Sequence, residues 1–220
     1  MTPGRLVTLA RESRTADAPP TPPAALPVEH CELCGAPIEP VHRHLLSLES
    51  RELLCSCRAC ALLFDREAAS EGRYKLIGDR RLRLDALELS DAMWADLRLP
   101  VDVAFFFYNS TAGRVQAYYP SPMGPTESLL RLEAWAGLVA ANPVLGSLEA
   151  DVEALLVDRA RGARRAWLVP IDECYSLVGL IRSRWRGLTG GAEVWQEMQG
   201  FFDELDRRCR PGGRETTWPG

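Results

Sequence analysis

The sequence predicts an α+β protein in which a small zinc-ribbon-like lobe precedes an antiparallel-sheet domain with packed helices. Three observations support this fold class. Five of the seven cysteines lie between Cys31 and Cys60. Two pairs of short apolar runs, each pair joined by a turn, are each followed by residues with helical periodicity. The hydrophobic fraction of 46% and the charged fraction of 25% are those of an ordinary globular protein.

The composition excludes several other classes. Sixteen prolines and the lack of a long repeat exclude a coiled coil or a collagen-like rod. The formal net charge of −4 does not suit a polycation built for phosphate backbones, so nucleic acid is not the expected partner. No stretch of about 18 apolar residues predicts a membrane span, and residues 1–20 lack the apolar core of an export signal. We therefore expect a cytoplasmic protein.

The chain divides into four parts. Residues 1–29 are rich in proline and alanine, which predicts a disordered leader. Residues 30–66 are expected to form the ribbon-like lobe, residues 72–210 the α+β domain and residues 211–220 a flexible tail. A lobe of this size buries too little apolar area to fold alone, so a metal ion or the rest of the chain must stabilise it.

Within the lobe, the order of elements is knuckle, strand, turn, strand and knuckle. The first strand includes His42, Leu45 and Leu46, the turn centres on residues 49–50, and the second strand covers residues 51–55.

The first half of the larger domain is expected to start with a strand over residues 74–84. Ser90 then caps a short helix whose apolar face is Met93, Trp94 and Leu97. Strands at residues 101–108 and 114–119 form a hairpin in a half-buried sheet, and the segment PSPMGP at 120–125 forms a rigid turn. Pro125 is expected to start the next helix.

The second half repeats this outline. Strands at residues 152–159 and 164–169 form a hairpin around Gly162. One helix begins near Asp172, which we expect to be its N-cap, and the glycines between residues 187 and 191 end it. The buried face of this helix comprises Tyr175, Val178, Ile181 and Trp185. The apolar spacing of a second helix predicts the buried positions Val194, Trp195, Met198, Phe201, Phe202 and Leu205. Residues 211–213, Pro-Gly-Gly, are expected to end the fold.

The cysteine spacing is the strongest chemical signal. Cys31 and Cys34 form one C-x2-C pair, and Cys57 and Cys60 form another. Two such knuckles on a hairpin are typical of a four-thiolate tetrahedral site, and Gly35 permits the open backbone that the first knuckle needs. We predict Cys31, Cys34, Cys57 and Cys60 as the ligands of a structural Zn²⁺, whose binding energy would help to fold the lobe.

Three alternatives remain open at this site. Cys55 lies two residues before Cys57 and either replaces it as a ligand or packs beside the site as a spare thiol. All three histidines, His30, His42 and His44, belong to this lobe, and any of them could replace a cysteine ligand. Because four thiolates are already present, we expect the histidines to lie beside the site or at the surface. Iron is the alternative to zinc, because four thiolates also bind a single redox iron or an iron–sulfur cluster.

Other groups give weaker signals. Cys174 lies near a predicted helix start, where a thiol can become a nucleophile, but no histidine is near it in sequence, so a buried helix residue is the preferred interpretation. Arginines at 161, 164, 165, 182, 184 and 186 alternate with tryptophans, which could contact nucleic acid, although a solvated face is the simpler interpretation. We find no catalytic constellation and do not expect an enzyme.

Three segments together resemble a bacterial family of unknown function. They read HRHLLSLESRELLCSCRACALLF, FFFYNSTAGRVQAYYPSPMGPTESLL and WLVPIDECYSLVGLIRSRWRGLTGG, and the resemblance covers about residues 30–210. Members of that family are small cytoplasmic proteins, often encoded beside high-affinity uptake nickel–iron hydrogenase genes in actinobacteria. The resemblance implies an association with hydrogenase assembly or function and carries over no catalytic residue.

The first hypothesis is therefore a non-enzymatic accessory protein whose structural zinc site supports a surface for a protein partner, a hydrogenase subunit or maturation factor. The alternatives are a rubredoxin-like iron electron carrier in the same system, a nucleic-acid-binding zinc ribbon and an enzyme that depends on Cys174.

Overall fold

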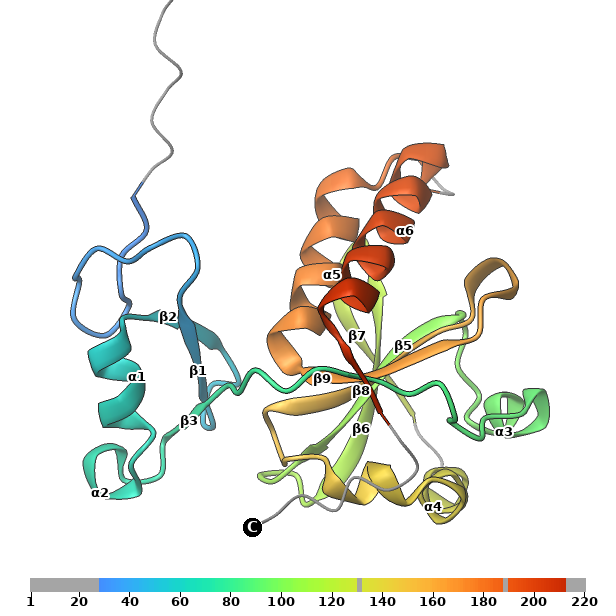
Figure 1. The fold of residues 1–220 in the computed structure, drawn as a ribbon, viewed down its shortest axis with the longest axis horizontal. Helices are drawn as coiled ribbons and strands as arrows, with labels where there is room; N and C mark the ends of the chain where they lie inside the picture. The colour runs from blue at the N-terminus through green and yellow to red at the C-terminus, as the bar shows by residue number, and fades with distance from the viewer. Residues whose placement is uncertain (1–27, 130–131, 188–189, 213–220) are drawn as a thin grey trace, which may run out of the picture.

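The computed structural model describes residues 28–129, 132–187 and 190–212. The leader predicted for residues 1–29 therefore lies almost wholly outside the described residues, as does the tail from residue 213. Figure 1 shows a small lobe followed by a larger body of sheet and helices, so the mixed α and β content with antiparallel sheets is confirmed. No helix in the described ranges combines the length and the apolar character that crossing a bilayer requires.

The small lobe is built on a three-stranded antiparallel sheet in the order β2-β1-β3. Its elements are β1 (Arg43–Ser47), β2 (Leu53–Ser56), α1 (Arg58–Phe64), α2 (Glu67–Ser70) and β3 (Tyr74–Leu76). The predicted hairpin is confirmed, because Leu45 faces Leu54 in the β1–β2 register. Leu45 and Leu46 are buried, whereas His42 lies just before the strand that was expected to include it.

Within the described residues, the larger sheet has seven strands in the order β10-β4-β9-β8-β5-β6-β7. Its strands are β4 (Leu82–Arg83), β5 (Val103–Asn109), β6 (Arg114–Ser121), β7 (Gly124–Ser128), β8 (Glu153–Asp158), β9 (Arg165–Pro170) and β10 (Arg210–Pro211). Both predicted hairpins, β5–β6 and β8–β9, are present, and β5 joins them by pairing with β8. Every neighbouring pair is antiparallel except β10 with β4.

Helices cover both faces of this sheet (Figure 1). The helices are α3 (Asp91–Asp96), α4 (Leu132–Ala141), α5 (Ile171–Arg184) and α6 (Gly191–Arg208), with short 3-10 turns at Pro143–Ser147 and Ala160–Gly162. Along β5, Phe105 and Phe107 pack in the core beneath α5 and α6, while Phe106 packs in the core that contains α3 and α4. The half-buried sheet expected here is therefore wrong for β5, which is buried on both faces and for that reason is continuously apolar.

Three expected elements differ in the structure. The single strand predicted over residues 74–84 is two short strands, β3 and β4, which belong to different sheets. The helix predicted from Pro125 is instead β7, because residues 121–124 turn the chain back and β7 pairs with β6; the helix begins later, at α4. The chain after α6 adds β10, a strand that the sequence did not predict and that Gly212 extends by donating its N–H to the Arg83 carbonyl at 2.7 Å.

The helix starts are partly as predicted. The Ser90 hydroxyl accepts the Met93 N–H, so the predicted cap of α3 is confirmed. At α5 the predicted cap is wrong: Pro170 occupies the N-cap position, and Asp172 lies inside the first turn. Its carboxylate is therefore free to bond outside its own helix. The predicted buried face of α5 contains Val178 and Ile181, but Cys174 and Leu177 are also buried, whereas Tyr175 and Trp185 are partly exposed.

The small lobe packs against the larger domain through apolar and polar contacts. Leu46 of β1 and Ile77 join the core cluster that includes α5 and α6. The Arg51 guanidinium donates to Asp151 at 2.7 Å, and the His44 imidazole donates to Asp172 at 2.9 Å. The cysteine-bearing hairpin is thereby held against the N-terminal end of α5.

Candidate metal centre

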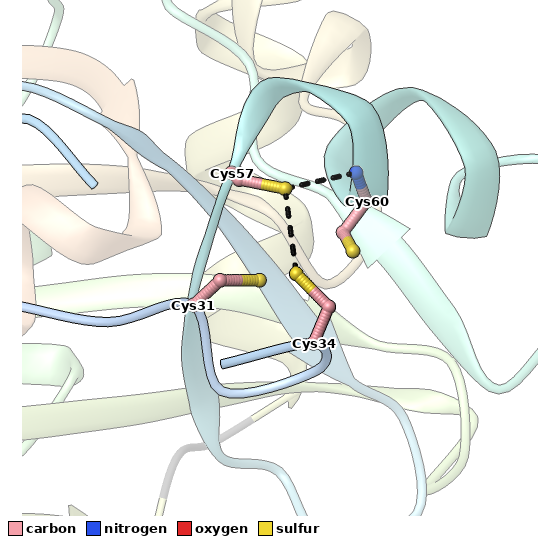
Figure 2. A group of neighbouring side chains, drawn as sticks. All are labelled: Cys31, Cys34, Cys57 and Cys60. Carbon is pink, nitrogen blue, oxygen red and sulfur yellow. Dashed lines mark hydrogen bonds between the residues drawn. The ribbon is translucent and has the colours of Figure 1, made fainter. Parts of the chain in front are cut away.

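The first knuckle is a tight turn between residues 31 and 36. The Cys31 N–H donates to the Ala36 carbonyl at 2.8 Å, and the Gly35 N–H donates to the Cys31 carbonyl at 2.7 Å. Gly35 has a φ of +72°, in the left-handed region where a side chain is disfavoured, as the sequence predicted. This turn presents the Cys31 and Cys34 sulfurs on one side of the backbone (Figure 2).

The second knuckle leads directly into α1. Cys57 is the N-cap residue of that helix, and its sulfur accepts the Cys60 N–H at 3.4 Å. The N-cap position therefore fixes the Cys57 sulfur at the start of α1. The sequence predicted the knuckle but not the helix that follows it.

The two knuckles bring four sulfurs together. The Sγ atoms of Cys31, Cys34, Cys57 and Cys60 all lie within 4.8 Å of one another and point toward a common centre (Figure 2). The Cys34 and Cys57 sulfurs are 3.8 Å apart, and no disulfide joins them. A tetrahedral ion with metal–sulfur bonds of about 2.3 Å requires sulfur–sulfur separations of about 3.8 Å. The arrangement of the four side chains therefore fits a metal ion bound by four thiolates.

The thiols influence one another's protonation. Burial raises the pKa of Cys31, but N–H groups of Cys57, Leu33 and Cys34 stabilise its thiolate and bring that pKa down to about 6. Burial, together with the neighbouring thiols, strongly raises the pKa of Cys60. The Ala36 N–H lowers the pKa of Cys34, but the adjacent Cys31 and Cys57 thiols raise it, and the net direction is upward. Four negative charges are therefore unfavourable here without a cation, which a divalent metal would supply.

Cys55 is outside this group of four. Its sulfur lies instead with one ring nitrogen of His42 and one of His44, all within 4.8 Å of one another. Burial, and then the charges of Glu32 and Glu29, raise the pKa of Cys55. His30 is exposed and belongs to neither group. The four sulfurs that the spacing paired are thus the ones that the fold brings together.

The two isolated cysteines lie in the larger domain. Cys174 is fully buried in α5, and burial raises the pKa of its thiol well above the ordinary value. Cys209 follows α6 and is half-buried, and burial raises its pKa to about 11. Both thiols are therefore poor nucleophiles at neutral pH.

Several arginines of the basic stretch are bound to acidic groups. Arg165 donates to Asp158 and Asp203 and lies over the Trp167 and Phe202 rings. Arg164 pairs with Asp91, and Arg184 pairs with Glu197. Arg161 lies over the Trp195 ring at 4.8 Å. Arg164, Arg165 and Arg184 are therefore paired within the protein itself.

One contact between the small lobe and α5 could not be read from the sequence. Asp172 and His44 are separated by 128 positions, and no local pattern links a helix start to a strand of the small lobe.

A family model described as "Family of unknown function (DUF5947)" matches residues 30–209. No curated protein matches the chain, and no solved structure matches it.

Proposed function

This chain belongs to the DUF5947 family of unknown function, and we propose that it is a non-enzymatic metal-binding accessory protein. In this proposal Cys31, Cys34, Cys57 and Cys60 bind one structural zinc ion, which stabilises the small lobe as a surface for a protein partner. The observation that supports it is the convergence of the four sulfurs within 4.8 Å of one another. A site of four protein thiolates is coordinatively closed, which suits a structural role.

The surface next to this cluster supports the docking role. A groove of about 590 Å³ runs along the small lobe beside Cys57 and α1, and Ile38, Val41 and Leu62 line it. Two of these residues, Val41 and Leu62, are 93% and 58% exposed. Exposed apolar side chains gathered on one face are typical of a protein-binding surface. The resemblance described above makes a hydrogenase subunit or maturation factor the proposed partner.

Iron in the same four thiolates is the second candidate. Cys34 is exposed and Cys57 is partly exposed. A metal–thiolate centre so close to the surface could exchange electrons with a partner, as a rubredoxin-like carrier does.

Metal analysis of the full chain tests the proposal. We expect zinc in the purified protein and one ion per chain fewer in Cys57→Ser, because that change removes one of four thiolate ligands. Cys209→Ser is the matched control and should retain the wild-type metal content. If the purified protein instead contains iron and shows a visible thiolate-to-metal absorption band, the iron carrier is the correct candidate and the zinc proposal is wrong. Equal metal content in Cys57→Ser and wild type would overturn both.

The partner is tested by affinity purification from the native host under low oxygen. We expect a hydrogenase subunit or maturation factor to be recovered with wild type and lost with Leu62→Asp, because a charge in the groove opposes apolar contact. Met123→Asp is the control, since Met123 is 90% exposed and lies in the β6–β7 turn, away from the groove. Recovery that is equal for both variants would contradict docking at the groove.

A further inference from the structure

We propose that His42, His44 and Cys55 form a second metal site, for a divalent first-row transition ion, on the hairpin beside the four-cysteine cluster. The three residues contribute two imidazole nitrogens and one sulfur, and these atoms all lie within 4.8 Å of one another. The inference stands independently of the four-cysteine site and of the metal bound there.

The hairpin register explains why these three residues meet. His44 on β1 and Cys55 on β2 are direct cross-strand partners. His42 precedes His44 by two residues, and side chains two apart along an extended chain point to the same side. The His42 and His44 rings are accordingly in edge contact, with centroids 4.8 Å apart.

The tautomer of His44 is set by Asp172. The His44 Nδ1 lies 2.9 Å from the Asp172 Oδ2. A carboxylate can only accept, so Nδ1 must carry the hydrogen, and in the neutral ring Nε2 then carries a free lone pair. A carboxylate that fixes the far nitrogen of a histidine in this way is a recurrent feature of metal sites.

His42 is fixed in the same tautomer. Its Nδ1 lies 2.9 Å from the Glu39 carbonyl oxygen and 3.5 Å from the Glu29 carboxylate, both of which only accept. The His42 side chain is 10% exposed. Its Nε2 is therefore a lone-pair donor enclosed by protein.

The positions of unpartnered polar atoms supply a second, independent observation. Within the described residues, the buried side-chain nitrogen and oxygen atoms that lack any hydrogen-bond partner are the His42 Nε2 and the Asp172 Oδ1. One belongs to this group of three and the other to the carboxylate that orients it. A buried acceptor without a partner is unfavourable, and a cation bound by the three residues would satisfy the His42 Nε2.

The donor set indicates the class of ion. Imidazole and thiolate ligands favour zinc, cobalt, nickel or copper over magnesium or calcium, which prefer oxygen. Three protein ligands leave a coordination position open, unlike the closed four-thiolate site. The second ion should therefore exchange more readily than the first.

Cobalt(II) titration of the metal-depleted full chain tests this site by absorption spectroscopy. We expect wild type to bind two equivalents, whereas His42→Gln and His44→Gln should bind one. His30→Gln is the matched control and should bind two, because His30 is an exposed histidine of the same lobe. A wild type that saturates at one equivalent, or histidine variants that still bind two, would overturn the proposal.

Cadmium-113 NMR of the wild-type chain provides a test that does not depend on a variant folding. We expect two resonances, one typical of four sulfurs and one typical of mixed nitrogen and sulfur ligands. Cys57→Ser should remove the four-sulfur resonance and retain the mixed one, so failure of the structural site and failure of this site give different spectra. A wild-type spectrum without the mixed-ligand resonance would show that the second site does not exist.

Discussion

At the residue scale, Asp151 connects the turn of the small hairpin to the larger sheet. Its side chain is 2% exposed, and it accepts hydrogen bonds from the Arg51 guanidinium at 2.7 Å and the Ser110 N–H at 2.9 Å. Burial raises the pKa of Asp151, but the Ser110 and Arg51 contacts lower it by more, so the pKa lies below its ordinary value. The ionised carboxylate is therefore the form that the fold stabilises.

Asp151→Asn should destabilise the protein by about 1–3 kcal/mol at pH 7, because Arg51 loses its charged partner. Asparagine tolerates the left-handed φ of +69° at this position, so backbone strain does not confound the comparison. A carboxyl with a lowered folded-state pKa stabilises the fold above the unfolded value of about 3.9, and this contribution is lost as the pH falls through the folded value. The difference from wild type in urea unfolding should therefore shrink below about pH 4.

The control for that experiment is Asp85→Asn. Asp85 pairs with Arg83, but the two side chains are 54% and 42% exposed, and an exposed pair contributes about 0–1 kcal/mol. An Asp151→Asn variant no less stable than Asp85→Asn at pH 7 would contradict the role assigned to Asp151.

What the sequence reveals at this scale depends on distance along the chain. The paired cysteines are two local motifs, so spacing alone indicates which four sulfurs converge. Asp151 is 100 positions from Arg51 and Asp172 is 128 from His44, and these pairings follow only from the packing of the small lobe on the larger domain. The three residues around Cys55 meet through the predicted hairpin, but the carboxylate that orients His44 comes from α5 and could not be read from the sequence.

At the element scale, the predictable parts are those with their own periodicity or turn chemistry. Both hairpins of the larger sheet and the long apolar stripe of α6 have such signals. The strands β4 and β10 are two residues each and exist only because neighbours pair with them. Pro125 was misread as a helix start because proline is also tolerated on an edge strand, and β7 is the edge of the larger sheet.

The turn between α5 and α6 gives a test of element packing through two glycines. Gly190 has a φ of +81°, and a Cβ there would lie 2.8 Å from Val194 Cγ1 and 3.0 Å from the Trp185 ring. Gly200 lies in mid-helix on α6, where a Cβ would meet nothing within 4 Å. Gly190→Ala should therefore destabilise the protein by about 1–3 kcal/mol. Gly200→Ala should stabilise it by about 0.5–1 kcal/mol, since alanine is the better helix former.

Thermal or urea unfolding of the two variants measures this contrast under one set of conditions. The same substitution is then compared at the start and in the middle of α6, so a general effect of added methyl groups cancels. Equal effects of the two alanines would mean that the α5–α6 turn does not depend on the left-handed backbone at Gly190.

At the scale of the whole molecule, apolar burial is distributed unevenly. The larger sheet has a core on each face, and these cores include large fully buried side chains such as Trp167, Phe105 and Phe106. The small lobe contributes few fully buried apolar groups, among them Leu45, Leu46 and Ala61. The lobe must therefore depend on its contacts with the larger domain and, in the proposal above, on a metal ion bound at the four-cysteine site.

Removing metal should destabilise the small lobe and leave the larger domain folded. With a chelator that strips both sites, we expect amide exchange to become fast across β1, β2 and α1. The strands β5 and β8 should keep their protection, because they rely on cores that contain no cysteine of the cluster. Hydrogen exchange followed by mass spectrometry measures this difference directly. Cys57→Ser should make α1 exchange fast, as the chelator does, but the second proposed site should keep the β1–β2 hairpin protected. His42→Gln should leave α1 protected, because it affects only the second proposed site. Uniform loss of protection throughout the chain would instead mean that lobe and domain unfold as one cooperative unit, with the contacts of Leu46, Ile77 and the Arg51–Asp151 pair strong enough to couple them.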